Sequence, residues 1–239
     1  MSERTGSLSG HVALVTGSTR GIGRAIAERF AAAGARVVVN GRDAEAARAV
    51  AATLDGALGI GADVSDLVSV RAMCDRATEA LGPVDILVNN AGISSRRAIT
   101  RMSDDEWFES LAVNLTGSMY TIRELVPGMK AGGWGRIVNV TSGAATHGNA
   151  GFSAYAAAKG GVVGLTLTLA IELDRFGIRV NALAPAALTD MLRQLPPELL
   201  DPMIEAGLPT VEECAQAALG LVIDDAPNGE VVHVGGSDV

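Results

Sequence analysis

The chain has 239 residues and a formal net charge of −8, and 48% of its residues are hydrophobic but only 3% are aromatic. A chain of this length can bury a sizeable core, which here must be built from Ala, Val, Leu and Ile. The net negative charge gives no sign of a basic binding surface, which argues against nucleic acid or an anionic membrane as the partner. The N-terminus lacks the apolar core of a signal peptide and no run is expected to span a bilayer, so we expect a cytoplasmic protein.

Apolar runs of strand length alternate with helical patterns along the chain. Strands are predicted at 12–15, 36–39, 57–62, 84–88, 137–140, 179–183 and 231–234. Helices are predicted at 21–33, 44–54 and 65–81, in two segments within 103–129, at 153–176 and at 211–221. Such alternation is typical of an α/β fold in which a parallel sheet carries helices on both faces. We find no second domain or internal repeat.

A glycine-rich segment joins the first predicted strand directly to the first predicted helix. It reads Thr16-Gly17-Ser18-Thr19-Arg20-Gly21-Ile22-Gly23. Glycines let the backbone turn sharply and approach a pyrophosphate, and the free N–H groups at a helix start favour negative charge. The spacing departs from Gly-x-Gly-x-x-Gly, and one alternative is that Gly17 serves only the turn. The position between a strand and a helix predicts dinucleotide binding.

Tyr155 and Lys159 lie four residues apart on one predicted helix, so their side chains project from the same face. Ser142 follows the preceding strand and adds a hydroxyl. A cation beside a phenol favours the phenolate, so we expect Lys159 to lower the pKa of Tyr155 toward neutrality. The set is suited to proton transfer, although Tyr-x-x-x-Lys alone also fits an ordinary pair on a helix surface.

Several motifs together resemble the short-chain dehydrogenase/reductase family, in order and spacing. They are Thr16-Gly17-x-x-x-Gly21-Ile22-Gly23, Asn89-Asn90-Ala91-Gly92, Asn114, Ser142, Tyr155-x-x-x-Lys159 and Asn181-x-x-x-Pro185. The resemblance covers residues 8–191 and 211–236, and the run from 136 to 159 is similar to the 3-oxoacyl-carrier-protein reductase branch. It implies a Rossmann-type doubly wound parallel sheet of about seven strands in a three-layer sandwich. We therefore expect a single NAD(P)-binding domain over 1–239, with a small substrate lid around 185–209.

The resemblance also implies a role for each of four catalytic residues. Tyr155 would be the general acid in carbonyl reduction and the general base in alcohol oxidation. Lys159 would lower the pKa of Tyr155 and hold the nicotinamide ribose, and Ser142 would bind the substrate oxygen. Asn114 would support a water relay through Lys159, the alternative being a structural amide inside a helix. His147 is interpreted as a solvated loop residue that could reach substrate.

The cofactor site implied by the resemblance comprises Gly17, Ser18, Arg20, Gly21, Ile22, Gly23, Asn40, Arg42, Asp63, Val64, Asn90, Ala91, Gly92, Tyr155, Lys159, Pro185 and Thr189. A carboxylate at the end of the second strand would bind the ribose 2′-hydroxyl of NAD. This chain has Asn40 there, with Arg42 and Arg20 nearby, and guanidinium groups suit a 2′-phosphate. NADPH is therefore favoured over NAD. Surface charge is the alternative role for both arginines, and Asp43 weakens the preference.

Two features bear on metals and on partner proteins. Cys74 and Cys214 have no metal-ligand spacing, so we expect buried thiols and no metal site. Pro127 and Ile171 stand where the carrier-docking arginines of acyl reductases would align, which weakens the interpretation that a carrier protein presents the substrate. Pro185-Ala186 also departs from the Pro-Gly common in the family.

We expect an oxidoreductase that transfers hydride between NADPH and a ketone or secondary alcohol, with a 3-oxoacyl thioester among the candidate substrates. The alternatives are an NAD-dependent secondary alcohol dehydrogenase and a non-catalytic nucleotide-binding homologue. The helix at 153–176 is apolar around much of its circumference. This pattern predicts one face on the sheet and another on a partner subunit, hence a homodimer or tetramer. Cover by a loop of the same chain is the alternative.

Overall fold

The computed structural model describes residues 8–187, 200–201, 204–205 and 207–235 of the chain. Its centre is an all-parallel, seven-stranded sheet in the order β3-β2-β1-β4-β5-β6-β7. The strands are β1 (Val12–Val15), β2 (Arg36–Gly41), β3 (Leu58–Gly61), β4 (Ile86–Asn89), β5 (Gly135–Val140), β6 (Ile178–Pro185) and β7 (Val231–Val234). The predicted α/β, Rossmann-type fold is confirmed.

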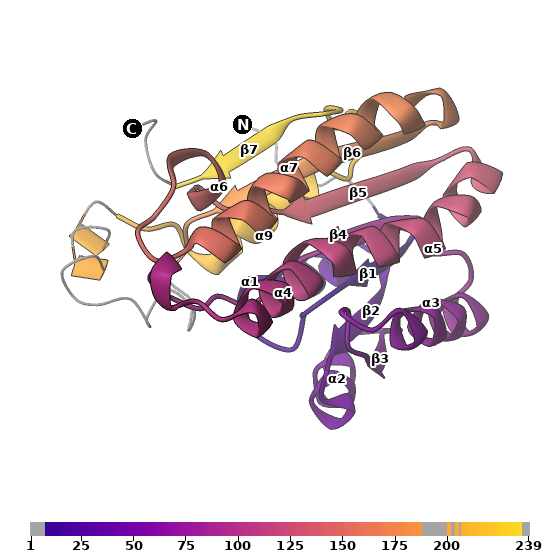
Figure 1. The fold of residues 1–239 in the computed structure, drawn as a ribbon. Helices are drawn as coiled ribbons and strands as arrows, with labels where there is room; N and C mark the ends of the chain where they lie inside the picture. Colours follow the sequence, from indigo (N-terminus) through magenta and orange to yellow (C-terminus); the bar gives the residue numbers. More distant parts are fainter. Residues whose placement is uncertain (1–7, 188–199, 202–203, 206, 236–239) are drawn as a thin grey trace.

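Helices cover both faces of this sheet. They are α1 (Gly21–Ala32), α2 (Ala44–Ala51), α3 (Leu67–Leu81), α4 (Asp104–Leu111), α5 (Gly117–Gly132), α6 (Ala144–His147), α7 (Ser153–Leu173) and α9 (Val211–Gly220). One apolar core joins the sheet to α1, α2 and α9, and a second joins it to α3, α5 and α7. Figure 1 shows α5 and α7 running in front of the sheet. The result is the expected three-layer sandwich.

Small residues allow the helices to approach the sheet closely. A Cβ built on Gly59 in β3 would lie 2.5 Å from the main-chain oxygen of Ala47 in α2. A Cβ on Gly135 in β5 would lie 2.8 Å from the sulfur of Met129 in α5. Contacts of this length leave no room for a side chain, which explains how a chain so poor in aromatic residues fills its core.

The sheet order creates a switch point between β1 and β4. From β1 the chain crosses outward to β2 and β3, and it then returns to place β4 on the other side of β1. The connections that follow β1 and β4 therefore run in opposite directions from the carboxyl ends of these two strands. In doubly wound sheets this crevice is where ligands bind.

The two helical segments predicted within 103–129 are confirmed as α4 and α5, and a π-helical turn, η2 (Ala112–Thr116), separates them. One expectation about the helices is corrected. The helical stretch Ser153–Phe176 has a mean hydropathy of 1.4, so by length and composition alone it could cross a membrane, contrary to our prediction from sequence. In the structure this helix packs on β5 and β6, and a third of its most apolar window is buried.

Candidate active site

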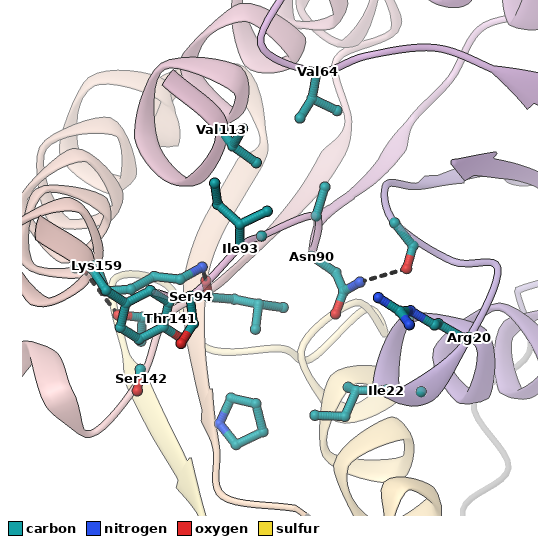
Figure 2. A pocket seen from close by; sticks show the side chains of 18 of the residues that line it. Arg20, Ile22, Val64, Asn90, Ile93, Ser94, Val113, Thr141, Ser142 and Lys159 are labelled. Carbon is teal, nitrogen blue, oxygen red and sulfur yellow. Dashed lines mark hydrogen bonds between the residues drawn. The ribbon is translucent and has the colours of Figure 1, made fainter. Parts of the chain in front are cut away.

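A cavity of about 590 Å³ opens at the carboxyl edge of the sheet. Most of the predicted site residues line it: Gly17, Arg20, Gly21, Ile22, Gly23, Asn40, Arg42, Asp63, Val64, Asn90, Ala91, Gly92, Ser142, Tyr155, Lys159 and Pro185. Figure 2 shows Lys159 and Ser142 on one side, Arg20 and Ile22 on the other, and Asn90 between them. Ser18 and Asn114 do not line the cavity, and Thr189 lies outside the described residues, as does most of the predicted lid.

The glycine-rich loop is tied to the loop that follows β4. The Asn90 side chain donates hydrogen bonds to the main-chain oxygens of Thr16 and Gly17, at 2.9 and 3.0 Å. The Thr16 hydroxyl accepts from the backbone N–H groups of Asn90 and Ala91, at 3.0 and 3.1 Å. Gly17 has a φ of +62°, and a Cβ there would lie 2.8 Å from the Cα of Ala91. Only glycine meets both conditions.

The start of α1 is suited to an anion. Arg20 occupies the N-cap position, and its side chain does not hydrogen-bond the first N–H groups of the helix. These groups therefore remain available beside the cavity, where the helix dipole favours negative charge. The charge of a pyrophosphate suits this helix start, and the absence of side chains at Gly17 and Gly23 lets the glycine loop pack closely against Ala91 and Asn90.

The side chains of Ser18 and Asn40 hold the loop together from inside. Asn40 accepts a hydrogen bond from the Gly17 N–H at 3.3 Å and donates to the main-chain oxygens of Ile60 and Ala62, at 3.3 and 3.2 Å. The Ser18 hydroxyl donates to the Val15 oxygen at 2.6 Å. Both side chains are buried, so they position the loop and leave little of themselves to face a ligand.

Two exposed arginines, Arg20 and Arg42, line the outer part of the cavity. Asp43 lines the cavity as well, and its carboxylate accepts hydrogen bonds from the Glu45 and Ala46 N–H groups and caps α2. The pKa of Asp63 is lowered, first by a hydrogen bond from Ser65 and to a smaller extent by the Arg42 charge. This region therefore combines two guanidinium groups with two carboxylates, Asp43 at the start of α2 and Asp63 just after β3.

The residues predicted to transfer a proton lie on the opposite side of the cavity. Lys159 is buried on α7, and its ammonium donates to the main-chain oxygen of Val140 at 2.8 Å. Burial lowers the pKa of Lys159 to about 8. The ammonium lies 5.8 Å from the centre of the Tyr155 ring, and the Tyr155 hydroxyl is hydrogen-bonded to Ser142. The three residues converge as their spacing predicts.

The prediction that the pKa of Tyr155 is lowered is wrong. Burial raises the pKa of this phenol, and the hydrogen bond with Ser142 offsets only part of the rise. Desolvation decides the direction of this shift, and the Lys159 ammonium donates its hydrogen bond to the Val140 oxygen. Tyr155 is consequently protonated at neutral pH.

Asn114 lies in the π-helical turn and is fully buried. Its side chain accepts from the Ile93 N–H at 3.2 Å and donates to the Ile93 oxygen and the Ser110 oxygen, both at 2.9 Å. A Cβ on Gly92 would lie 2.7 Å from the Asn114 amide oxygen and 3.6 Å from the Lys159 ammonium. Asn114 thus fixes the loop after β4 beside Lys159, and its role in a water relay stays a prediction.

Sequence reasoning missed some residues of the site. Thr141 lines the cavity, and its hydroxyl donates to the Lys159 main-chain oxygen at 3.0 Å, holding α7 against the end of β5. Its position directly before Ser142 in the sequence could have identified it as a site residue. Ile93, Ser94, Val113 and Phe152 also line the cavity, and no local pattern distinguishes them. His147 is exposed on α6 and does not line it.

Comparisons with known proteins agree with this geometry. The family model described as short chain dehydrogenase matches residues 11–200. The chain is 38% identical over 237 residues to a 3-oxoacyl-[acyl-carrier-protein] reductase of Haemophilus influenzae, covering 96% of this chain and 98% of that protein. A reductase of the same name from Pseudomonas aeruginosa is 42% identical over 241 residues, with coverage of 96% and 98%.

A relative with a different name is similarly close. A D-beta-hydroxybutyrate dehydrogenase of Cupriavidus necator is 41% identical over 238 residues, covering 94% of this chain and 86% of that protein. By their names, one kind of relative reduces an oxo group and the other dehydrogenates a hydroxy acid. The chain belongs to the short-chain dehydrogenase family, and it is an NAD(P)-dependent oxidoreductase of CH–OH or carbonyl groups.

Proposed function

We propose that this enzyme reduces a ketone with NADPH, with a 3-oxoacyl thioester as the leading substrate class. The observation that carries the proposal is the convergence of Tyr155, Ser142 and Lys159 in one cavity, across from an uncapped helix start. The relatives named 3-oxoacyl-[acyl-carrier-protein] reductase support the thioester. A non-catalytic homologue is disfavoured because proton donor, cation and second hydroxyl are all present.

The cavity residues account for the proton chemistry. When bound, the nicotinamide supplies the hydride for the carbonyl carbon. Tyr155 and Ser142 would bind the carbonyl oxygen through their hydroxyls. Negative charge builds on that oxygen as the carbon is reduced, and the Tyr155 phenol then donates its proton. Because its pKa is raised, Tyr155 holds that proton throughout the neutral range.

Lys159 has two proposed tasks. Below about pH 8 its ammonium is charged, so it would stabilise the phenolate left on Tyr155. The same group would hydrogen-bond the nicotinamide ribose. Its bond to the Val140 oxygen fixes it in place. Asn114 would act behind Lys159, through the loop that carries Gly92 and Ile93.

The preference for NADPH rests on Arg20 and Arg42 at the cavity rim. The objection raised by Asp43 is weakened because that carboxylate caps α2. Two guanidinium groups suit the charge of a 2′-phosphate. Titrating NADPH and NADH into the enzyme, with binding followed by cofactor fluorescence, tests this. Tighter binding of NADH would contradict it.

A second candidate function is the reverse reaction, in which the enzyme oxidises a secondary alcohol with NAD as the cofactor. The relative named D-beta-hydroxybutyrate dehydrogenase favours it. The same residues would then act in reverse, with Tyr155 as the base. Comparing kcat/KM for the ketone and the alcohol of one substrate pair distinguishes the two directions.

We further propose a homodimer or tetramer that works in the cytoplasm. On α7, Ile171 is 83% and Leu167 is 43% exposed, and on the adjoining α4 Phe108 is 64% exposed. Apolar side chains this exposed are suited to a subunit contact. Light scattering at micromolar concentration should give at least twice the 24.4 kDa chain mass. A monomer would contradict the assembly.

A further inference from the structure

A second cavity, of about 470 Å³, lies beside the active site, and three of its six lining residues are arginines. Its lining residues are Arg96, Arg97, Ala98, Arg101, Ala150 and Gly151. They come from the loop after β4, from the 3₁₀ turn η1 (Ile99–Arg101) and from the loop before α7. No acidic side chain is among the described residues that line it. Such a cavity is unexpected in a chain with a net charge of −8.

Hydrogen bonds hold its two walls together. The Arg97 N–H donates to the Gly151 oxygen at 2.8 Å, and the Arg96 guanidinium donates to the Ala150 oxygen at 3.4 Å. Gly151 has a φ of +86°, and a Cβ there would lie 2.8 Å from the Cγ of Arg96. The stem of Arg96 therefore lies directly on the glycine. A side chain at Gly151 would push it away.

The charge of the cavity is only partly compensated. Arg97 forms an ion pair with Glu106 at 2.8 Å, and that glutamate also caps α4. In the described part of the chain, neither Arg96 nor Arg101 has a carboxylate within ion-pair distance. Three guanidinium groups and one carboxylate leave two net positive charges. This matches the charge of about −1.5 to −2 on a phosphate monoester near neutral pH better than that of a single carboxylate.

The two cavities are lined by neighbouring residues of the same two loops. Ser94 lines the catalytic cavity and Arg96 lines the second, two residues further along one loop. On the facing loop, Asn149 and Phe152 line the first cavity while Ala150 and Gly151 line the second. Two residues span at most about 7 Å. The linings of the two cavities therefore come within this distance of each other, which would let one elongated molecule reach both.

We propose that the Arg96, Arg97 and Arg101 cavity binds a phosphate group carried by the substrate at a distance from its ketone. This inference rests on the proposed function and deepens it. The substrate class is a 3-oxoacyl thioester of a small phosphorylated thiol, of which coenzyme A is the accessible example. Guanidinium forks bind phosphate oxygens in pairs, so the cavity anchors the tail while the thioester end reaches Tyr155.

The first test is calorimetric binding of free coenzyme A to enzyme saturated with NADP⁺, so that the cofactor site is filled. The test variant is the double substitution Arg96→Ala with Arg101→Ala. Arg76→Ala is the matched control, because Arg76 is exposed on α3 and lines neither cavity. Loss of one charge-assisted hydrogen bond weakens binding about tenfold or more, so we expect at least that increase in Kd for the double variant and none for the control.

The second test compares turnover of acetoacetyl-coenzyme A with that of S-acetoacetyl-N-acetylcysteamine, which has the same reacting end and no phosphate. The double variant should raise KM for the first about tenfold or more and leave the second unchanged. With NADPH at saturating concentration, so that the cofactor site is filled, added pyrophosphate should inhibit only turnover of the coenzyme A thioester. This distinguishes recognition of the phosphates from recognition of the adenosine.

The outcomes separate this inference from the proposed function. If wild-type enzyme binds no coenzyme A, or if the double variant binds it as tightly as the control, the phosphate site is wrong even when both thioesters are reduced. If coenzyme A binding depends on the arginines but neither thioester is turned over, the phosphate site stands and the proposed reductase activity fails.

Discussion

The two sides of the active-site cavity are built by different means. On the nucleotide side, β1, β2 and α1 present mainly glycine and backbone, with Ser18 and Asn40 buried behind the loop. On the catalytic side, β5 and α7 present functional side chains, and Lys159 is only 3% exposed. On our proposal, cofactor selectivity depends on the exposed arginines, whereas proton transfer depends on buried, hydrogen-bonded groups. Cofactor choice should therefore be exchangeable, and the proton donor should not.

The largest expected effect comes from the catalytic side. Tyr155→Phe removes one hydroxyl and its proton, so turnover should fall by about 10²–10⁴-fold or more. Cofactor affinity should stay close to that of the wild type, because the glycine loop is untouched. Steady-state kinetics and a cofactor titration on the same preparation measure both quantities. Near-normal turnover would remove Tyr155 from its role.

A smaller effect is expected at the rim of the nucleotide side. Arg42→Asp should erase or reverse the preference for NADPH, because it removes a donor worth about 1.5–3 kcal/mol and adds repulsion toward a 2′-phosphate. The control is Arg48→Asp, since Arg48 is on the exposed face of α2 and does not line the cavity. An unchanged ratio of the two cofactor Kd values in Arg42→Asp would place the phosphate elsewhere.

The glycine loop should not tolerate an added side chain. A Cβ on Gly23 would lie 2.3 Å from the Asn90 amide nitrogen and 2.5 Å from the Gly17 oxygen, so Gly23→Ala should lower the free energy of unfolding by about 1–3 kcal/mol and weaken cofactor binding. Gly220→Ala is the control, because nothing lies within 4 Å of its Cβ position. Equal denaturation midpoints for the two variants would show that the loop can adjust.

The pH dependence gives the smallest expected effect. Oxidation of the alcohol needs the Tyr155 phenolate, so its rate should rise with pH, since burial raises that pKa. Reduction needs the protonated phenol and should decline only in alkaline solution, beginning near pH 8 as Lys159 loses its charge. Ser142→Ala removes the hydrogen bond that lowers the Tyr155 pKa, so the oxidation limb should move to higher pH.

The control for that shift is Thr146→Ala, because Thr146 is an exposed hydroxyl on α6 that does not line the cavity. Profiles of kcat/KM against pH for the three proteins are the measurement. If kcat/KM for oxidation rises over the same pH range in Ser142→Ala as in the wild type, a group other than the Tyr155–Ser142 pair determines that pH range.

Local sequence patterns were sufficient to predict strand bounds, residues that share a helix face and the glycine-rich turn. The strands Val12–Val15 and Val231–Val234 begin and end where their apolar runs predict. Tyr155 and Lys159 share a helix face, so their spacing was sufficient to bring them together. The glycine-rich turn was likewise readable, because its position between strand and helix is a property of the chain itself.

Features that depend on tertiary contacts were not predictable in this way. The π-helical turn at Ala112–Thr116 carries no glycine or proline that would reveal it. The direction of the Tyr155 pKa shift depends on burial, which spacing does not report. The arginine cavity needs the loop after β4 to meet Gly151, more than 50 residues further along the sequence. The catalytic and cofactor roles themselves stay predictions.

The central claim is that a ketone is reduced in this cavity by NADPH with Tyr155 as the proton donor. The most direct measurement is a single-turnover experiment in which enzyme loaded with NADPH is mixed with acetoacetyl thioesters or simple cyclic ketones while the cofactor absorbance is followed. We predict a rapid loss of NADPH absorbance with at least one ketone in the wild type and none on that timescale in Tyr155→Phe. Equal traces for the two proteins would contradict the account.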